Sequence, residues 1–368
     1  MSNDDRTVLR TREEVLAKAA TSHGLANTIL RGLDLSGADL SGVHFTQALL
    51  ESVSLRGAKL GGVRLTKARF EACDFDGADL RGSNWFLVEA TGCTMRQANL
   101  DGCEMPMTRL DRCTLLASRL IGATLEGIQL VACDLSGANL GGATLTGAEL
   151  EGCVLDQAFL DDADFGAVTW VGGSALRARF LGTQLTEAKL TSLDLAGARF
   201  DRAVLFGAVW SRIRAAGAVF TDADLTGIEL TECDLSESNL LRAKLTGARS
   251  GEGPPLVAER ANLHGASLAG ACLPGVVLRS ANLSLADAAG ARLEGAQLDG
   301  AQLVRTNLDD ARLDGARFDR ALLDHVSFDG ASCRGAAFGG ATLVTVDLSR
   351  ARLEDADMAH VRVVAESV

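Results

Sequence analysis

Every fifth residue is apolar over most of this chain, and that period constrains the fold more than any other feature. From Leu30 this phase runs unbroken to Leu245, mostly as Leu with some Phe. We call each of these apolar residues the centre of its pentad. Two residues before most centres stands a second small or branched apolar residue, as at Ala38 and Val43. A period of five matches neither an α-helix, at about 3.6 residues, nor a β-strand, at about 2. A backbone that turns a corner after each pentad, in contrast, points every centre inward.

Four such sides close a square coil, and stacked coils pair their backbones along the axis. Glycine often stands two residues after a centre, as at Gly37 and Gly42, where a tight corner needs permissive dihedral angles. A run of cysteines supports four pentads per turn, because its members follow one another at intervals of 20 residues in the inward position before a centre. These cysteines are Cys73, Cys93, Cys113, Cys133 and Cys153.

Individual pentads point to a known family. The segments ADLSG at 38–42, ADLRG at 78–82 and ANLGG at 138–142 resemble the A(D/N)LXX signature of pentapeptide-repeat proteins. The resemblance covers about nine-tenths of the chain. It implies an all-β fold, a right-handed quadrilateral β-helix, which the number of centres predicts to have about 16 coils.

The period breaks once. The centre expected at position 250 is Ser250, and the two prolines that follow, Pro254 and Pro255, cannot donate ladder hydrogen bonds. A second run, in a different phase, extends from Leu263 to Val363. We expect a bulged loop within one continuous solenoid; two solenoids joined by a hinge is the alternative.

The two ends of the chain differ. Thr11 and Glu14 form a capping box, which predicts a short helix over residues 12–21 that covers the first coil. No comparable cap follows the last repeats, so that end is a candidate for docking or dimerisation, with fraying as the alternative. The predicted organisation is an N-terminal segment with a capping helix (1–22), a first repeat run (23–248), a phase-breaking loop (249–260), a second run (261–363) and a tail (364–368).

Charge and hydropathy narrow the function. The net charge is −12, from 36 Lys and Arg against 48 Asp and Glu, and both signs are interspersed. No basic stripe exists to neutralise phosphates, so direct nucleic-acid binding is disfavoured. The start of the chain lacks a signal-peptide pattern, and no run approaches the roughly 18 apolar residues of a membrane helix. The sequence therefore predicts a cytoplasmic protein without a membrane segment.

Acidic residues recur directly after the centres of the second run, and we call these seven residues the acidic belt. They and two valines near the C-terminal end form the predicted interaction surface. Nearby arginines offer an alternative, a solvated face with local ion pairs. The candidate residues are Glu294, Asp299, Asp309, Asp314, Asp319, Asp324, Asp329, Val361 and Val363.

Chemistry-bearing motifs are missing from the sequence. There is no CxxC pair and no histidine placed to complete a zinc site, so the buried cysteines are interpreted as small packing side chains. A coil filled by its own leucines leaves no pocket of the kind that catalysis needs. The sequence therefore predicts no enzyme, no cofactor and no metal.

What remains is a rod-like protein-interaction scaffold with protein partners, which could dimerise through its C-terminal end. The lead-in Leu9–Ala17 resembles the start of pentapeptide-repeat segments found with bacterial type VI secretion adaptors, and that resemblance implies a role in effector loading. Some members of the family protect topoisomerases as acidic DNA mimics, which gives one alternative. A secreted effector module is another.

Overall fold

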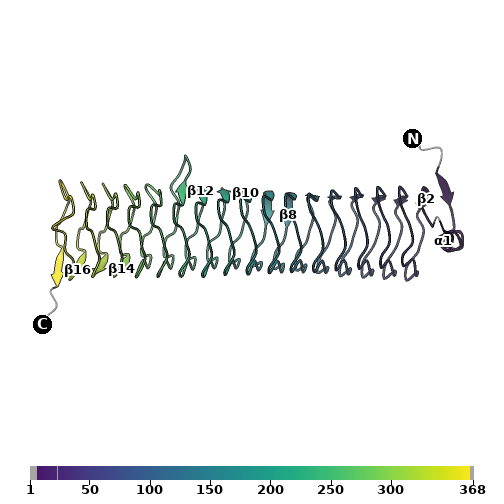
Figure 1. Ribbon diagram of the computed structural model, residues 1–368, viewed down its shortest axis with the longest axis horizontal. Coiled ribbons are helices and arrows are strands. Elements are labelled where there is room, and N and C mark those ends of the chain that lie inside the picture. The colour runs from purple at the N-terminus through teal and green to yellow at the C-terminus, as the bar shows by residue number, and fades with distance from the viewer. Residues whose placement is uncertain (1–5, 23, 365–368) are drawn as a thin grey trace. The chain divides into compact units, whose positions relative to one another are not determined.

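The structure, a computed structural model, describes residues 6–22 and 24–364. The chain forms two compact units, Met1–Gln184 (unit 1) and Leu185–Val368 (unit 2). Each is a parallel β-solenoid of stacked turns, and unit 1 also holds the one short helix found among the described residues (Figure 1). The predicted fold class is confirmed.

In unit 1 each side of a turn pairs with the same side of the next turn. The parallel register joins residues 20 apart on all four sides, as in the bridges Asp34↔Ser54, Asp39↔Lys59 and His44↔Arg64 and the strand pair Leu49↔Arg69. Four pentads per turn are therefore present. The elements of unit 1 are β1 (Thr7–Leu9), α1 (Arg12–Ala19), β2 (Thr28–Arg31), β3 (Leu49–Glu51), β4 (Arg69–Glu71), β5 (Glu89–Thr91), β6 (Arg109–Asp111), β7 (Gln129–Val131), β8 (Glu149–Val154) and β9 (Thr169–Ser174).

Unit 2 repeats this architecture in two sheets. Its strands are β10 (Lys189–Thr191), β11 (Val209–Ser211), β12 (Glu229–Thr231), β13 (Arg249–Ser250), β14 (Gln302–Val304), β15 (Leu322–Asp324), β16 (Thr342–Val344) and β17 (Arg362–Val364).

The core of both units is made by the pentad centres. Every centre from Leu30 to Leu245 and from Leu263 to Leu343 is buried. Full burial of one leucine stabilises the fold by roughly 1.5–3 kcal/mol relative to exposure. Trp85 is fully buried with Ala90 at the next centre, so that a large residue beside a small one keeps the core volume nearly constant.

Tight corners follow the centres. Gly37 has φ 67°, in the left-handed region where a side chain is disfavoured. The same corner conformation is also taken by residues with a side chain, such as Gln47 at φ 60°. The geometry of the coil therefore imposes the corner, and glycine only makes it easier to adopt.

Helix α1 is confirmed and ends two residues before the predicted boundary. The Thr11 hydroxyl accepts a hydrogen bond from the Glu14 N–H at 3.2 Å. The Glu14 carboxylate accepts from the Arg10 N–H at 2.7 Å, one residue before the position that a capping box predicts. The Arg12 side chain donates to the backbone carbonyl of Asp34 at 3.0 Å, and Val15 is fully buried. The helix thus closes the first turn.

The phase break forms a loop within one turn of unit 2. Bridges on all four sides join residues 23 apart here, from Asp234↔Val257 to Arg249↔Cys272, so the ladders continue past the insertion. The loop protrudes beside β12 (Figure 1), and residues 252–254 at its tip are exposed.

The number of turns differs from the sequence estimate. The two units together contain about 18 turns, where the centres alone predicted 16. Leu25 and Ala258 are buried beyond the ends of the regular runs, and β1 with α1 makes a first turn without pentads. Leu25 and Ala258 lie five residues before Leu30 and Leu263 and continue the period, but the count began at those two leucines. The turn of β1 and α1 does not repeat the period, so the period could not reveal it.

Candidate interaction surface

The acidic belt is spread over all four sides of the coil. The backbone register aligns residues 20 apart, which stacks Glu294 beside Asp314 on one side and Asp299 beside Asp319 on another. Asp309 and Asp329 share a third side, where Asn307 bridges Ser327. The belt therefore brings acids together in pairs and does not form one continuous acidic face.

Basic side chains contact most of these carboxylates. Asp299 is only 14% exposed and Asp329 is 42% exposed, so the belt is half-buried. The contacts are Glu294 with Arg312 at 2.9 Å, Asp299 and Asp319 with Arg317 at 3.0 Å each, Asp329 with Arg350 at 2.6 Å, and Asp324 with His325 at 2.6 Å.

The other two acids of the belt bind the following turn by hydrogen bonds. Asp309 accepts from the Ser327 hydroxyl and, at 2.9 Å, from the Asp329 N–H. Asp314 accepts from the Ser332 hydroxyl at 2.5 Å and from the Arg334 N–H at 2.9 Å. The hydroxyl of Ser332 is the main reason why the pKa of Asp314 is lowered. These contacts tie successive turns together.

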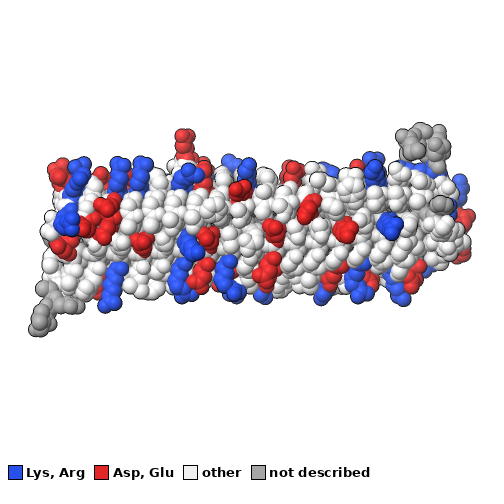
Figure 2. Space-filling model, in the orientation of Figure 1, with Lys and Arg blue, Asp and Glu red and all other residues white. Residues whose placement is uncertain are grey.

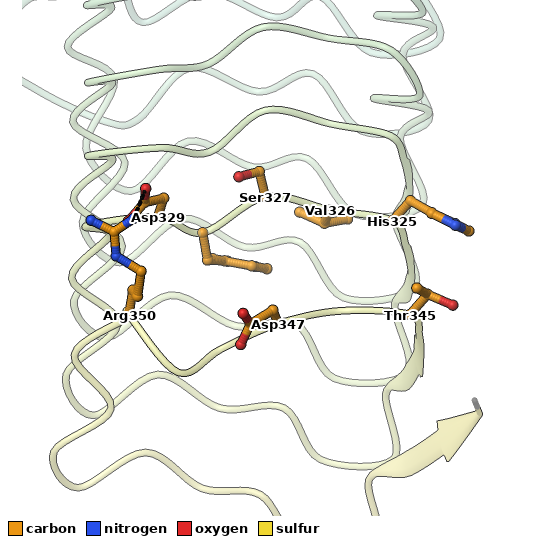
Figure 3. Close-up of a pocket in the computed structure, with 8 residues that line it drawn as sticks. His325, Val326, Ser327, Asp329, Thr345, Asp347 and Arg350 are labelled. Atoms are coloured by element: carbon orange, nitrogen blue, oxygen red, sulfur yellow. Dashed lines mark hydrogen bonds and ion pairs between the residues drawn. The ribbon is translucent and has the colours of Figure 1, made fainter. Parts of the chain in front are cut away.

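A hollow of about 330 Å³ lies beside the belt near the C-terminal end (Figure 3). Val326 and Phe328 are buried beneath it, and Asp329 and Arg350 point toward one another at its rim. The hydroxyl of Ser327, also in its lining, donates a hydrogen bond to the carboxylate of Asp309. The hollow therefore offers polar contacts to a partner.

The last described turn exposes its core. Leu348 and Leu353 are half-exposed, Met358 is 38% exposed and Val363 is 76% exposed. Val361, the other predicted valine, is half-exposed in the same turn. We call these five residues the terminal plate. The sequence pattern predicted only its two valines. The register of the last turns shows that Leu348, Leu353 and Met358 belong to the same surface.

Unit 1 carries a second apolar surface that the sequence indicated only in part. Phe86, Leu87 and Met107 are 39%, 40% and 61% exposed. They lie on neighbouring turns, because the Leu87 N–H donates to the Pro106 carbonyl at 3.4 Å. The signal was available as apolar residues in the two positions after a centre, where most pentads have polar residues or glycine.

Charges of both signs are mixed on one face of the molecule. On the face seen in Figure 2, basic and acidic side chains are interspersed. Within the described ranges, no three His, Cys, Asp or Glu side chains are grouped to hold a metal ion. No helix among the described residues is long and apolar enough to span a membrane.

Comparison with family models gives eight matches to pentapeptide repeats. They lie at residues 25–47, 48–84, 128–168, 177–209, 216–249, 261–300, 289–324 and 327–362, which is well over half of the chain. The chain belongs to the pentapeptide-repeat family. Among curated proteins, no sequence matches it.

Solved pentapeptide-repeat proteins resemble the chain. HetL, involved in heterocyst differentiation regulation in Nostoc sp. strain PCC 7120, is 25% identical over 79% of this chain and 96% of its own, with a TM-score of 0.25. QnrB1, a plasmid-mediated fluoroquinolone resistance protein, is 20% identical over 61% of this chain and 94% of its own, with a TM-score of 0.23. A protein from the Arabidopsis thaliana thylakoid lumen is 25% identical over 35% of this chain and 73% of its own, with a TM-score of 0.23. At such TM-scores these likenesses carry no argument about function.

Proposed function

We propose that this pentapeptide-repeat protein is a non-enzymatic interaction scaffold that docks a protein partner on its terminal plate. One observation carries the proposal. All regular centres up to Leu343 are buried, whereas the four centres that follow are half-exposed or exposed, reaching 76% at Val363. An apolar surface of this kind next to β17 suits a partner that covers side chains and extends the sheet.

The chemistry of the plate defines the partner. Its centre is aliphatic, whereas Asp347, Arg350 and Arg352 around it are exposed. This arrangement of an apolar centre and a charged rim is typical of protein–protein interfaces. A second copy of the chain would satisfy it, which makes the predicted homodimer one form of the proposal.

The test is a quantitative pull-down from native lysate with the wild-type chain and the variant Val363→Asp. We expect the variant to capture at least tenfold less of the specific partner than the wild type, while its circular dichroism spectrum is unchanged. The control Val8→Asp changes an exposed valine of β1, far from the plate in sequence. Light scattering of the purified chain identifies a second copy as the partner. Equal capture by wild type and Val363→Asp would refute docking on the plate.

A link to type VI secretion is the more specific form of this function. It is supported by the resemblance of residues 9–17, in which α1 begins. If the link holds, the captured partner is a secretion adaptor, spike component or effector. Capture of an unrelated partner by the plate would exclude the secretion role and leave the scaffold function standing.

DNA mimicry remains the second candidate, supported by the net charge of −12. It requires carboxylates free to replace phosphates, and the ion-paired acidic belt offers few of these. Inhibition of a DNA gyrase by the purified chain at low salt would support it. DNA mimicry would be ruled out if the purified chain neither inhibits the gyrase nor relieves its poisoning by a quinolone.

A further inference from the structure

Five thiols are stacked in unit 1, and we call them the cysteine column. All are free and buried. Each Sγ lies 3.3–3.6 Å from the carbonyl oxygen 23 residues earlier and 3.4–3.6 Å from the carbonyl oxygen two residues earlier. The members are Cys73, Cys93, Cys113, Cys133 and Cys153.

The repeated contacts fix the spacing of the sulfur atoms. Because every thiol contacts the same pair of backbone carbonyls, all five side chains have the same orientation. Successive turns of a parallel sheet are about 4.8 Å apart, so neighbouring Sγ atoms follow one another at about this interval. A metal–thiolate bond is about 2.3 Å long. The midpoint between two neighbouring thiols therefore lies about one bond length from each.

Packing alone does not require cysteine at these positions. Val53, one turn before the column, and Leu193 and Ile213 in unit 2 fill the corresponding inward position and are equally buried. The site accepts larger aliphatic side chains, so what distinguishes the column is the reactivity of its thiols.

We propose that the cysteine column binds soft monovalent cations, Cu(I) or its chemical analogue Ag(I), each held in a line between the thiols of two successive turns. Thiolates select such cations, and two-coordinate binding needs no third ligand. The column does not provide a tetrahedral zinc site, because no three potential ligands among the described residues surround one point. Five thiols in a row form two separate pairs and thus hold two cations.

Binding leaves the buried site neutral. One thiol of a pair releases its proton to solvent and binds as a thiolate, while its neighbour keeps its proton and donates a sulfur lone pair. A monovalent cation with one thiolate carries no net charge, which avoids the large penalty of a buried charge.

The experiment compares Ag(I) uptake by the full reduced chain and two double variants in chloride-free buffer. Cys93→Ala/Cys133→Ala removes every adjacent pair and leaves three separated thiols. Cys103→Ala/Cys233→Ala removes two buried thiols that have no thiol neighbour and leaves the column intact. Dialysis with metal analysis and the ultraviolet absorbance of silver–thiolate bonds give the stoichiometry.

We expect the wild type and the control variant to bind two more Ag(I) per chain than Cys93→Ala/Cys133→Ala, and Zn(II) uptake to be the same in all three. X-ray absorption should show two sulfur neighbours per silver. Equal Ag(I) binding by all three proteins, or three or more sulfur neighbours, would overturn the proposal. If the alanine variant does not fold, Cys93→Val/Cys133→Val replaces it, because Val53 already occupies the equivalent position.

Discussion

The first turn of unit 1 and the last described turn of unit 2 differ in how their cores are covered. At the N-terminal end, α1 leaves the pentad pattern and buries Val15 completely, while β1 continues the ladder onto β2. At the C-terminal end the pentads persist to β17, and no described residue covers Val363. An end is closed only where the chain abandons the repeat, because a pentad buries its centre only when another turn lies above it.

The largest expected effect tests the closed end. Val15→Asp places a carboxylate in a site with no partner and should cost about 3–5 kcal/mol. In a repeat protein the loss falls on the neighbouring turns, so native-state hydrogen exchange should show β2 opening while β7 keeps its protection. Leu16→Asp, at a residue that is 37% exposed, is the control and should change little. Equal effects of the two variants would mean that α1 does not cap the core.

A matched pair of leucines measures where the open end begins. Leu343→Ala removes a buried side chain, 4% exposed, and should lower the free energy of unfolding by about 2–4 kcal/mol. Leu353→Ala changes a half-exposed centre that lies two sides of the coil after Leu343. It should lower the free energy of unfolding by less than about 1 kcal/mol. Denaturant unfolding of both variants gives the comparison. A large loss from Leu353→Ala would show that a partner, such as a second copy, covers the terminal plate in solution.

A smaller effect is expected at the helix cap. Thr11→Ala removes the hydroxyl that accepts the Glu14 N–H and should cost about 1 kcal/mol. Thr11→Ser keeps the hydroxyl and should recover most of the loss. Hydrogen exchange of the first turns should therefore be faster in Thr11→Ala than in Thr11→Ser. No difference between the variants would assign closure of this end to the packing of Val15 alone.

The sequence predicted the repeating parts of the molecule and missed what does not repeat. The cysteine interval established four pentads per turn, and Thr11 with Glu14 located α1 to within two residues. The turn that holds β1 was missed because it does not continue the period. The buried Ala258 does continue it, five residues before Leu263, but was left out because the second run was counted from Leu263. The acidic belt was predicted as one surface, yet a one-dimensional pattern gives no account of which side each carboxylate faces. The arginines one turn away, such as Arg317 and Arg350, become visible only through the register.

The smallest expected effect is the acid response of the two ends. Asp34 beside the capped turn and Asp347 in the last turn both have a pKa lowered from 3.8, through the hydroxyl of Ser36 for Asp34 and the backbone N–H of Ser349 for Asp347. A lowered folded-state pKa adds stability above the unfolded pKa, and that stability is lost as the pH falls through the folded value. Titration of the side-chain carboxyl carbons by NMR should give both midpoints below 3.8. Asp347→Asn should remove the contribution of Asp347 to the acid response of the last turn and leave that of Asp34 unchanged. Since the hydrogen bond from the residue two positions on holds each carboxylate within its own corner, a midpoint shift of Asp34 in this variant would contradict independent ends.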